Sequence, residues 1–120
     1  MGEVRVSIEI KALGSNGAVP QRVEALADTG ATLTMIPGDV LKRAGVKPEG
    51  SVQVRMADGR TTDRPIGFAW VTVEGRSRPA TVMFGEAGDM VLLGLTVLEE
   101  TGLAVDPVNR TLIPAPFNLF

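Results

Sequence analysis

The sequence contains no cysteine and no histidine among its 120 residues. Without cysteine the chain can form neither a disulfide nor a thiol nucleophile, and without histidine it lacks the commonest general base and metal ligand of proteins. A Ser–His–Asp triad is impossible for the same reason. We therefore expect no metal and no organic cofactor, and any catalysis must use carboxylates, hydroxyls, lysine or arginine.

An excess of positive charge and long apolar runs are also missing. The 12 Lys and Arg residues against 14 Asp and Glu residues give a net charge of −2, and the cations are scattered along the chain. Neither nucleic acid nor an anionic membrane is therefore an expected partner. No apolar signal-peptide core follows the N-terminus, and no stretch reaches the roughly 20 apolar residues of a membrane span. The prediction is a cytoplasmic protein.

The composition is that of a globular domain. Hydrophobic residues make up 44% of the chain and charged residues 22%, which is far from the signature of disorder. A chain of this length buries roughly two-thirds of the surface that it exposes when unfolded, which is enough for a core. We predict one domain over residues 1–113, followed by a tail over 114–120 that Pro114 and Pro116 interrupt.

Alternating apolar and polar residues predict a mostly β fold. From Val4 to Ile10 every second residue is apolar, which is the period of a half-buried strand. After a turn at Gly14 to Gly17, further extended segments are expected at 21–27, 33–36, 51–56, 61–73, 80–84, 90–93, 103–105 and 111–113. Ala57 to Arg60 contains an Asp-Gly pair between two of these segments, which predicts a long projecting hairpin.

Two short helices are expected between the strands. The first covers Asp39 to Ala44 and ends at Gly45. In the second, of about two turns, Thr96 and Glu99 have the spacing of a capping box and Gly102 provides the stop.

Asp28, in the run Asp28-Thr29-Gly30, is the strongest candidate for chemistry. Its neighbours from Ala25 to Leu33 are mostly apolar or small, so a lone carboxylate there would be costly to ionise. Gly30 is expected to take a backbone conformation closed to other residues and to present its N–H to the acid, while Thr29 offers a hydroxyl for bracing. The plainer interpretation is a turn that ends a strand, for which Asp and Gly are favoured residues.

A later segment, Val91-Leu92-Leu93-Gly94-Leu95, runs from an apolar strand into a glycine and a helix. The Asp28-Thr29-Gly30-Ala31 loop, the hairpin and this segment, in that order, resemble the retropepsin-like family of aspartic peptidases. The resemblance extends from the first strand to Leu112. It implies an acid-protease fold: a closed or partly open β-barrel of six or seven strands, with a flap hairpin and one or two short helices.

The resemblance also assigns roles to residues. It implies that Asp28 is the catalytic acid, that Thr29 braces two active-site loops across a dimer axis, and that Gly94 backs the loop. Gly30 and Ala31 complete this loop, and the implied flap and substrate-binding residues are Met56, Ala57, Asp58, Gly59, Arg60 and Thr32. Retroviral members usually have an acid after the loop motif and an arginine after the late glycine, where this chain has Thr32 and Leu95. Substrate preference therefore cannot be carried over, and Asp58 by itself is more typical of a turn.

Three functional hypotheses follow from these residues. Two carboxyl groups that share one proton can deprotonate a water and protonate a peptide carbonyl, and since the chain has one such loop, the second must come from another copy. The first hypothesis is therefore a homodimeric aspartic endopeptidase that acts on peptides or proteins. The alternative is a catalytically weak or inactive module of the same fold that binds peptides or dimerises. The third is a monomer in which Asp28 only anchors a turn.

Overall fold

The computed structural model describes residues 3–14 and 19–119 and is mostly β, as predicted. Its elements are β1 (Arg5–Ala12), β2 (Gln21–Asp28), β3 (Thr34–Pro37), α1 (Gly38–Arg43), β4 (Gly50–Arg55), β5 (Thr61–Val73), β6 (Arg76–Gly85), β7 (Leu92–Gly94), α2 (Leu95–Glu100), β8 (Leu103–Asp106) and β9 (Thr111–Pro114). The turn predicted at Gly14 to Gly17 lies, apart from Gly14, outside the described residues.

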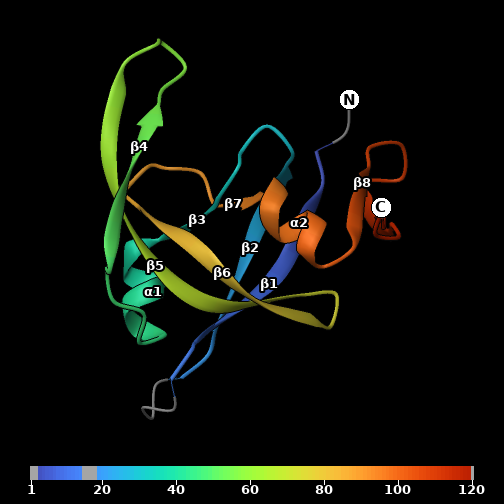
Figure 1. Cartoon of the computed structure of the whole chain (residues 1–120), viewed down its shortest axis with the longest axis horizontal. Coiled ribbons are helices and arrows are strands. Elements are labelled where there is room, and N and C mark those ends of the chain that lie inside the picture. The colour runs from blue at the N-terminus through green and yellow to red at the C-terminus, as the bar shows by residue number, and fades with distance from the viewer. Residues whose placement is uncertain (1–2, 15–18, 120) are drawn as a thin grey trace.

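Six strands close into a β-barrel (Figure 1). Their order is β1-β2-β7-β3-β6-β5, and a pairing of β5 with β1 completes the ring. The β2–β7 and β3–β6 pairs are parallel, and the other pairs are antiparallel. The predicted barrel is therefore confirmed, while β4 adds to β5 outside the ring and β8 pairs with β9 in a small second sheet.

Alternate residues of the barrel strands fill its interior. Ile8 lies opposite Val73 and Ile10 opposite Val71, and all four side chains are fully buried. Burying a side chain of this size contributes about 2 kcal/mol. Both helices add side chains to the same cluster, namely Leu41, Val97 and Leu98.

The hairpin of β4 and β5 projects beyond the barrel (Figure 1). Beyond the last strand pair, the N–H of Met56 donates to the carbonyl of Arg60 at 2.7 Å. Gly59 has φ of +89°, a left-handed conformation that favours glycine. The predicted Asp-Gly turn is therefore present at the tip.

The predicted apolar strand over 90–93 is shorter than expected. β7 begins only at Leu92, and Met90 is 52% exposed. Met90 and Leu92 line a surface cleft, and the prediction of an extended segment over 90–93 is wrong at its first two residues.

The capping box predicted for the second helix is also wrong. α2 begins after Gly94, and no side-chain hydrogen bond caps it. The N–H groups of its first two residues, Leu95 and Thr96, donate instead to backbone carbonyls of the loop that follows β2. Tertiary contact thus replaces the local cap.

Candidate active site

The loop after β2 fixes the side chain of Asp28. Asp28 is the last residue of β2 and is half-buried. The N–H of Gly30 donates to Asp28 Oδ1 at 2.8 Å, and the N–H of Ala31 donates to the Asp28 carbonyl at 3.2 Å. The first bond holds the carboxylate in one orientation, and the second holds the backbone of the loop.

The expected backbone conformation of Gly30 is not found. Its φ is not positive, so other residues could adopt this backbone. Its small size matters instead, because a Cβ would lie 3.2 Å from Asp28 Oδ1. Glycine lets the backbone amide approach the carboxylate without crowding it.

β7 lies directly beside this loop, and its last position has room only for glycine. β2 and β7 run parallel with Asp28 next to Gly94. A Cβ on Gly94 would lie 2.5 Å from the carbonyl carbon of Leu33 and 3.0 Å from the carbonyl oxygen of Ala31. Contacts under 3 Å require a backbone shift, so Gly94 sets how closely the Asp28 loop packs.

The N–H of Gly94 is bound by a buried threonine. It donates to Thr34 Oγ1 at 3.0 Å, and Thr34 is fully buried. Thr34 lies at the start of β3, so this bond joins β3 to the end of β7 behind the Asp28 loop. A buried N–H without an acceptor would cost about 1–3 kcal/mol.

Thr34→Val is therefore expected to lower the free energy of unfolding by about 1–2 kcal/mol, because valine keeps the shape and removes the acceptor. Urea unfolding of wild type and variant measures the difference. Thr111→Val, at an exposed threonine, is the matched control and should change stability by less than about 0.5 kcal/mol. Equal stabilities for Thr34→Val and wild type would contradict the role given to this bond.

The loop is also tied to α2 by main-chain bonds. The N–H of Leu95 donates to the carbonyl of Ala31 at 2.7 Å, and the N–H of Thr96 donates to that of Thr32 at 3.2 Å. Thr32 and Leu95 are the two positions at which retroviral members carry an acid and an arginine. Here the backbone joins the same two segments.

A cleft of about 780 Å³ extends from the Asp28 loop to the hairpin. Leu92, Met35 and Met83 lie side by side on β7, β3 and β6 and form part of its wall. Residues of β4 and of the hairpin tip line it opposite the loop: Val52, Gln53, Val54, Arg55, Met56 and Ala57. The lining is largely apolar, as in sites that bind peptide side chains.

The structure brings together only some of the predicted site residues. Gly30, Ala31 and Thr32 face the same cleft as Met56 and Ala57. The other predicted hairpin residues, Asp58, Gly59 and Arg60, form the exposed tip and do not line it.

Asp58 behaves as a turn residue. Its Oδ1 accepts the N–H of Arg60 at 3.0 Å, and its Oδ2 lies 2.7 Å from Arg60 Nε. The backbone N–H and then the guanidinium of Arg60 hold the pKa of Asp58 below its ordinary value. These bonds stabilise the tip and give Asp58 no contact with the Asp28 loop.

Asp28 lies between two surface cavities. Gly30, Ala31 and Thr32 line the first cavity, which is the cleft described above. Thr29 is exposed and lines the second, a groove of about 680 Å³ beside α2. That groove also includes Leu95 and Phe117. Asp28 itself is half-buried and lines neither cavity.

Most residues that line the cleft were not among the predicted site residues, and Met35, Met83, Arg64 and Asp89 are four of them. Met35 and Met83 belong to strands that are distant in sequence, and only the strand register makes them neighbours. Arg64 and Asp89 form an ion pair of 2.6 Å at the edge of the cleft. The neighbours of Arg64 in sequence, from Thr61 to Asp63, are polar, so no local signal marked it as buried.

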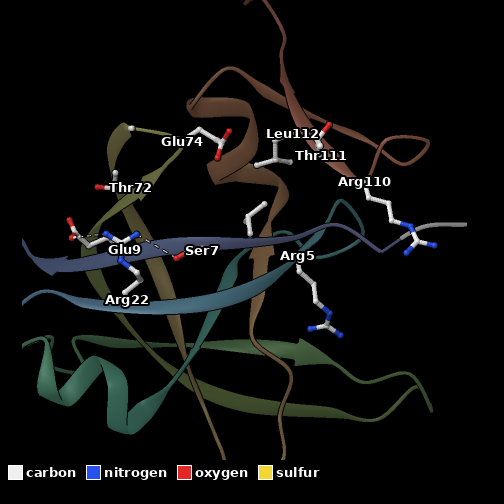
Figure 2. A pocket seen from close by; sticks show the side chains of 11 residues that line it. Arg5, Ser7, Glu9, Arg22, Thr72, Glu74, Arg110, Thr111 and Leu112 are labelled. Atoms are coloured by element: carbon white, nitrogen blue, oxygen red, sulfur yellow. Dashed lines mark hydrogen bonds and ion pairs between the residues drawn. The ribbon is translucent and has the colours of Figure 1, made fainter.

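Figure 2 shows a separate polar groove of about 550 Å³, lined by β1, β2, the β5–β6 turn and β9. Arg22 lies 3.9 Å from Glu9 and 3.5 Å from Ser7 within it. None of the predicted site residues lines this groove. It is therefore not the candidate active site.

No group of three His, Cys, Asp or Glu side chains in residues 3–14 and 19–119 is placed to bind a metal ion. Across the same described ranges, none of the helices is long and apolar enough to cross a membrane.

Comparison with models of known protein families shows to which family the chain belongs. The family described as gag-polyprotein putative aspartyl protease matches residues 16–100. The chain belongs to this aspartyl protease family. The predicted resemblance to retropepsin-like peptidases is thereby confirmed, and the match covers both the Asp28 loop and Gly94.

Solved structures agree with this aspartyl protease fold. The solution structure of simian foamy virus (mac) protease is 23% identical with a TM-score of 0.55, covering 78% of this chain and 90% of that one. A foamy viral protease-reverse transcriptase in complex with an RNA/DNA hybrid is 19% identical with a TM-score of 0.57. That match covers 98% of this chain but 13% of the larger protein. A search of curated proteins finds no match.

Proposed function

We propose that this aspartyl protease family member is an active aspartic endopeptidase that works as a homodimer, with one Asp28 from each copy. The observation that carries the proposal is the Asp28 carboxylate, held by the Gly30 N–H at 2.8 Å beside an apolar cleft. The bonds of Thr34 to Gly94 and of α2 to Ala31 and Thr32 fix the backbone behind this loop.

Two copies are required by the chemistry. One carboxylate takes a proton from the attacking water, while the other donates a proton to the carbonyl oxygen of the substrate. Each chain supplies one Asp28, and symmetric pairing is the commonest way to bring two identical residues together. The exposure of the neighbouring Thr29, which lines the groove beside α2, supports this arrangement.

The surface around Thr29 is the proposed contact with the second copy. Thr29 is exposed, and the adjoining groove carries the exposed apolar side chains of Leu95 and Phe117. Exposed apolar side chains next to the Asp28 loop favour association with a second copy of the chain. Thr29 would then brace the two loops against each other.

The substrate is proposed to be an extended peptide in the cleft, covered by the hairpin as a flap. An extended chain offers side chains alternately to the wall at Met35 and Met83 and to the hairpin at Val54 and Met56. The predicted roles of Met56, Ala57 and Thr32 in substrate binding belong to this proposal, and Asp58 to Arg60 would form the flap tip.

Digestion of a diverse peptide library from about pH 4 to pH 7 tests the function. Two charges about 3 Å apart repel by roughly 5 kcal/mol at an effective dielectric of 20, so the pair keeps one proton, as is known for aspartic proteases. Cleavage should therefore be fastest in mild acid and decline above neutral pH. A dimer in sedimentation that cleaves no peptide would favour the binding module instead.

A further inference from the structure

Arg64 is the one buried residue with a formal charge among the described residues, with 8% of its surface exposed. In the other ion pairs of these residues, which do not involve Arg64, every side chain is at least 38% exposed. Burying a charge is costly unless it is paired and hydrogen-bonded. A buried guanidinium therefore needs a reason beyond general solubility.

Arg64 connects the hairpin to the segment between β6 and β7. Its Nη1 donates to Asp89 Oδ2 at 2.6 Å, and its Nη2 lies 3.7 Å from Glu86 Oε1. Asp89 Oδ2 also accepts the N–H of Glu86 at 2.7 Å, which shapes the segment around the ion pair. In Figure 1 this segment passes beside the base of the hairpin before it enters β7.

Few other buried contacts attach the β4–β5 hairpin to the barrel. From Lys47 to Pro65, a range that the structure describes completely, Arg64 is the only buried residue. β4 pairs only with β5 and lies outside the closed barrel. The Arg64–Asp89 pair is therefore the main fixed point between the hairpin and the opposite side of the cleft.

The pair is also part of the cleft. Arg64 and Asp89 both line it, and Asp89 is followed directly by Met90, whose exposed side chain lines the same cavity. The segment then continues through Leu92 to Gly94 beside Asp28. Through its ion pairs with Asp89 and Glu86, Arg64 thus joins the hairpin strand to the segment that leads to the Asp28 loop.

We propose that Arg64 is a positioning residue. Its ion pair with Asp89 clamps the β4–β5 hairpin to the segment between β6 and β7, and this clamp sets how the hairpin closes over a bound peptide. The role of the clamp in catalysis rests on the function proposed above, whereas its effect on the hairpin does not. Because the clamp acts on closure and not on the reacting atoms, it should affect substrate affinity more than turnover.

The charges of the clamp are suited to acidic conditions. The Arg64 guanidinium, and then the backbone N–H of Glu86, hold the pKa of Asp89 below its ordinary value. A lowered folded-state pKa means that the stabilising charge is present above the ordinary value of about 3.9 and is lost only as pH falls through the lower one. The clamp therefore stays formed across the pH range in which the proposed dyad would work.

Amide hydrogen exchange tests the clamp without requiring activity. Arg64→Met keeps the length and apolar stem of the side chain and removes its charge. We expect amides of the β4–β5 pairs between Gly50 and Arg55 to exchange about 10-fold faster, while those of β1 and β2 stay within about twofold. Arg43→Met is the matched control, since it removes an exposed ion pair with Asp39 that does not line the cleft.

Kinetics on a cleaved peptide provide the second readout. In Arg64→Met, KM should rise about 10-fold with kcat within about threefold, and Arg64→Lys should recover part of the affinity. Asp89→Asn, which is nearly isosteric, should show the same pattern and replaces Arg64→Met if that variant does not fold.

The outcomes separate the two proposals. Unchanged hairpin exchange in these variants, or an equal increase over the whole barrel, would overturn the clamp whether or not the protein is active. If the wild type cleaves no peptide, the peptidase proposal fails, and the exchange result still decides the clamp.

Discussion

Asp28→Asn is expected to reduce peptide cleavage about 1,000-fold, which is the size of effect associated with losing a positioned acid–base group. Asparagine keeps an oxygen that can accept the Gly30 N–H, so the loop should retain its shape. The free energy of unfolding should therefore change by less than about 1 kcal/mol. Initial rates on a cleaved peptide and urea unfolding, measured on the same preparation, check both parts.

Asp39→Asn is the matched control for this substitution. Asp39 lies in the first turn of α1, is exposed and does not line the cleft. Its substitution should leave cleavage within about twofold. An Asp28→Asn variant that keeps wild-type activity would remove Asp28 from the proposed mechanism, and a loss of activity accompanied by unfolding would leave only a structural role.

Gly94→Ala is expected to lower the free energy of unfolding by about 3 kcal/mol and to abolish most activity. The new Cβ would lie 2.5 Å from the carbonyl carbon and 2.6 Å from the carbonyl oxygen of Leu33. Both are backbone atoms, so the loop behind Asp28 must move, and forced backbone shifts typically cost 1–3 kcal/mol or more. The thermal midpoint and the residual cleavage rate measure the two effects.

Gly14→Ala provides the comparison for Gly94→Ala. A Cβ on Gly14 would meet nothing within 4 Å, and its φ is not in the left-handed region. That variant should be as stable and as active as wild type. If Gly94→Ala matched it, the close packing of β7 against the Asp28 loop would not constrain the site.

Local patterns predicted the elements that depend on neighbouring residues. The alternation from Val4 to Ile10 identified β1, and the Asp-Gly pair identified the turn of the hairpin. Asp28 was singled out from its own short motif, and Gly94 from the resemblance to a known family. These are features that a sequence expresses over a few residues.

Features that depend on tertiary contact were missed or mistaken. Thr96 and Glu99 have the spacing of a capping box, but the loop carbonyls of Ala31 and Thr32 bind the first N–H groups of α2 instead. Met83 reaches the cleft only through strand register. The Arg64–Asp89 pair joins residues of two separate segments that no local pattern relates.

The central claim is that one Asp28 from each of two copies forms a single site, and a mixing experiment tests it most directly. Wild type and Asp28→Asn are combined in equal amounts, allowed to exchange subunits, and assayed at a fixed total chain concentration. With random pairing and two Asp28 carboxylates required, the rate should fall to about one quarter of that of wild type alone. A rate of about one half would show that each chain acts independently and would contradict the account.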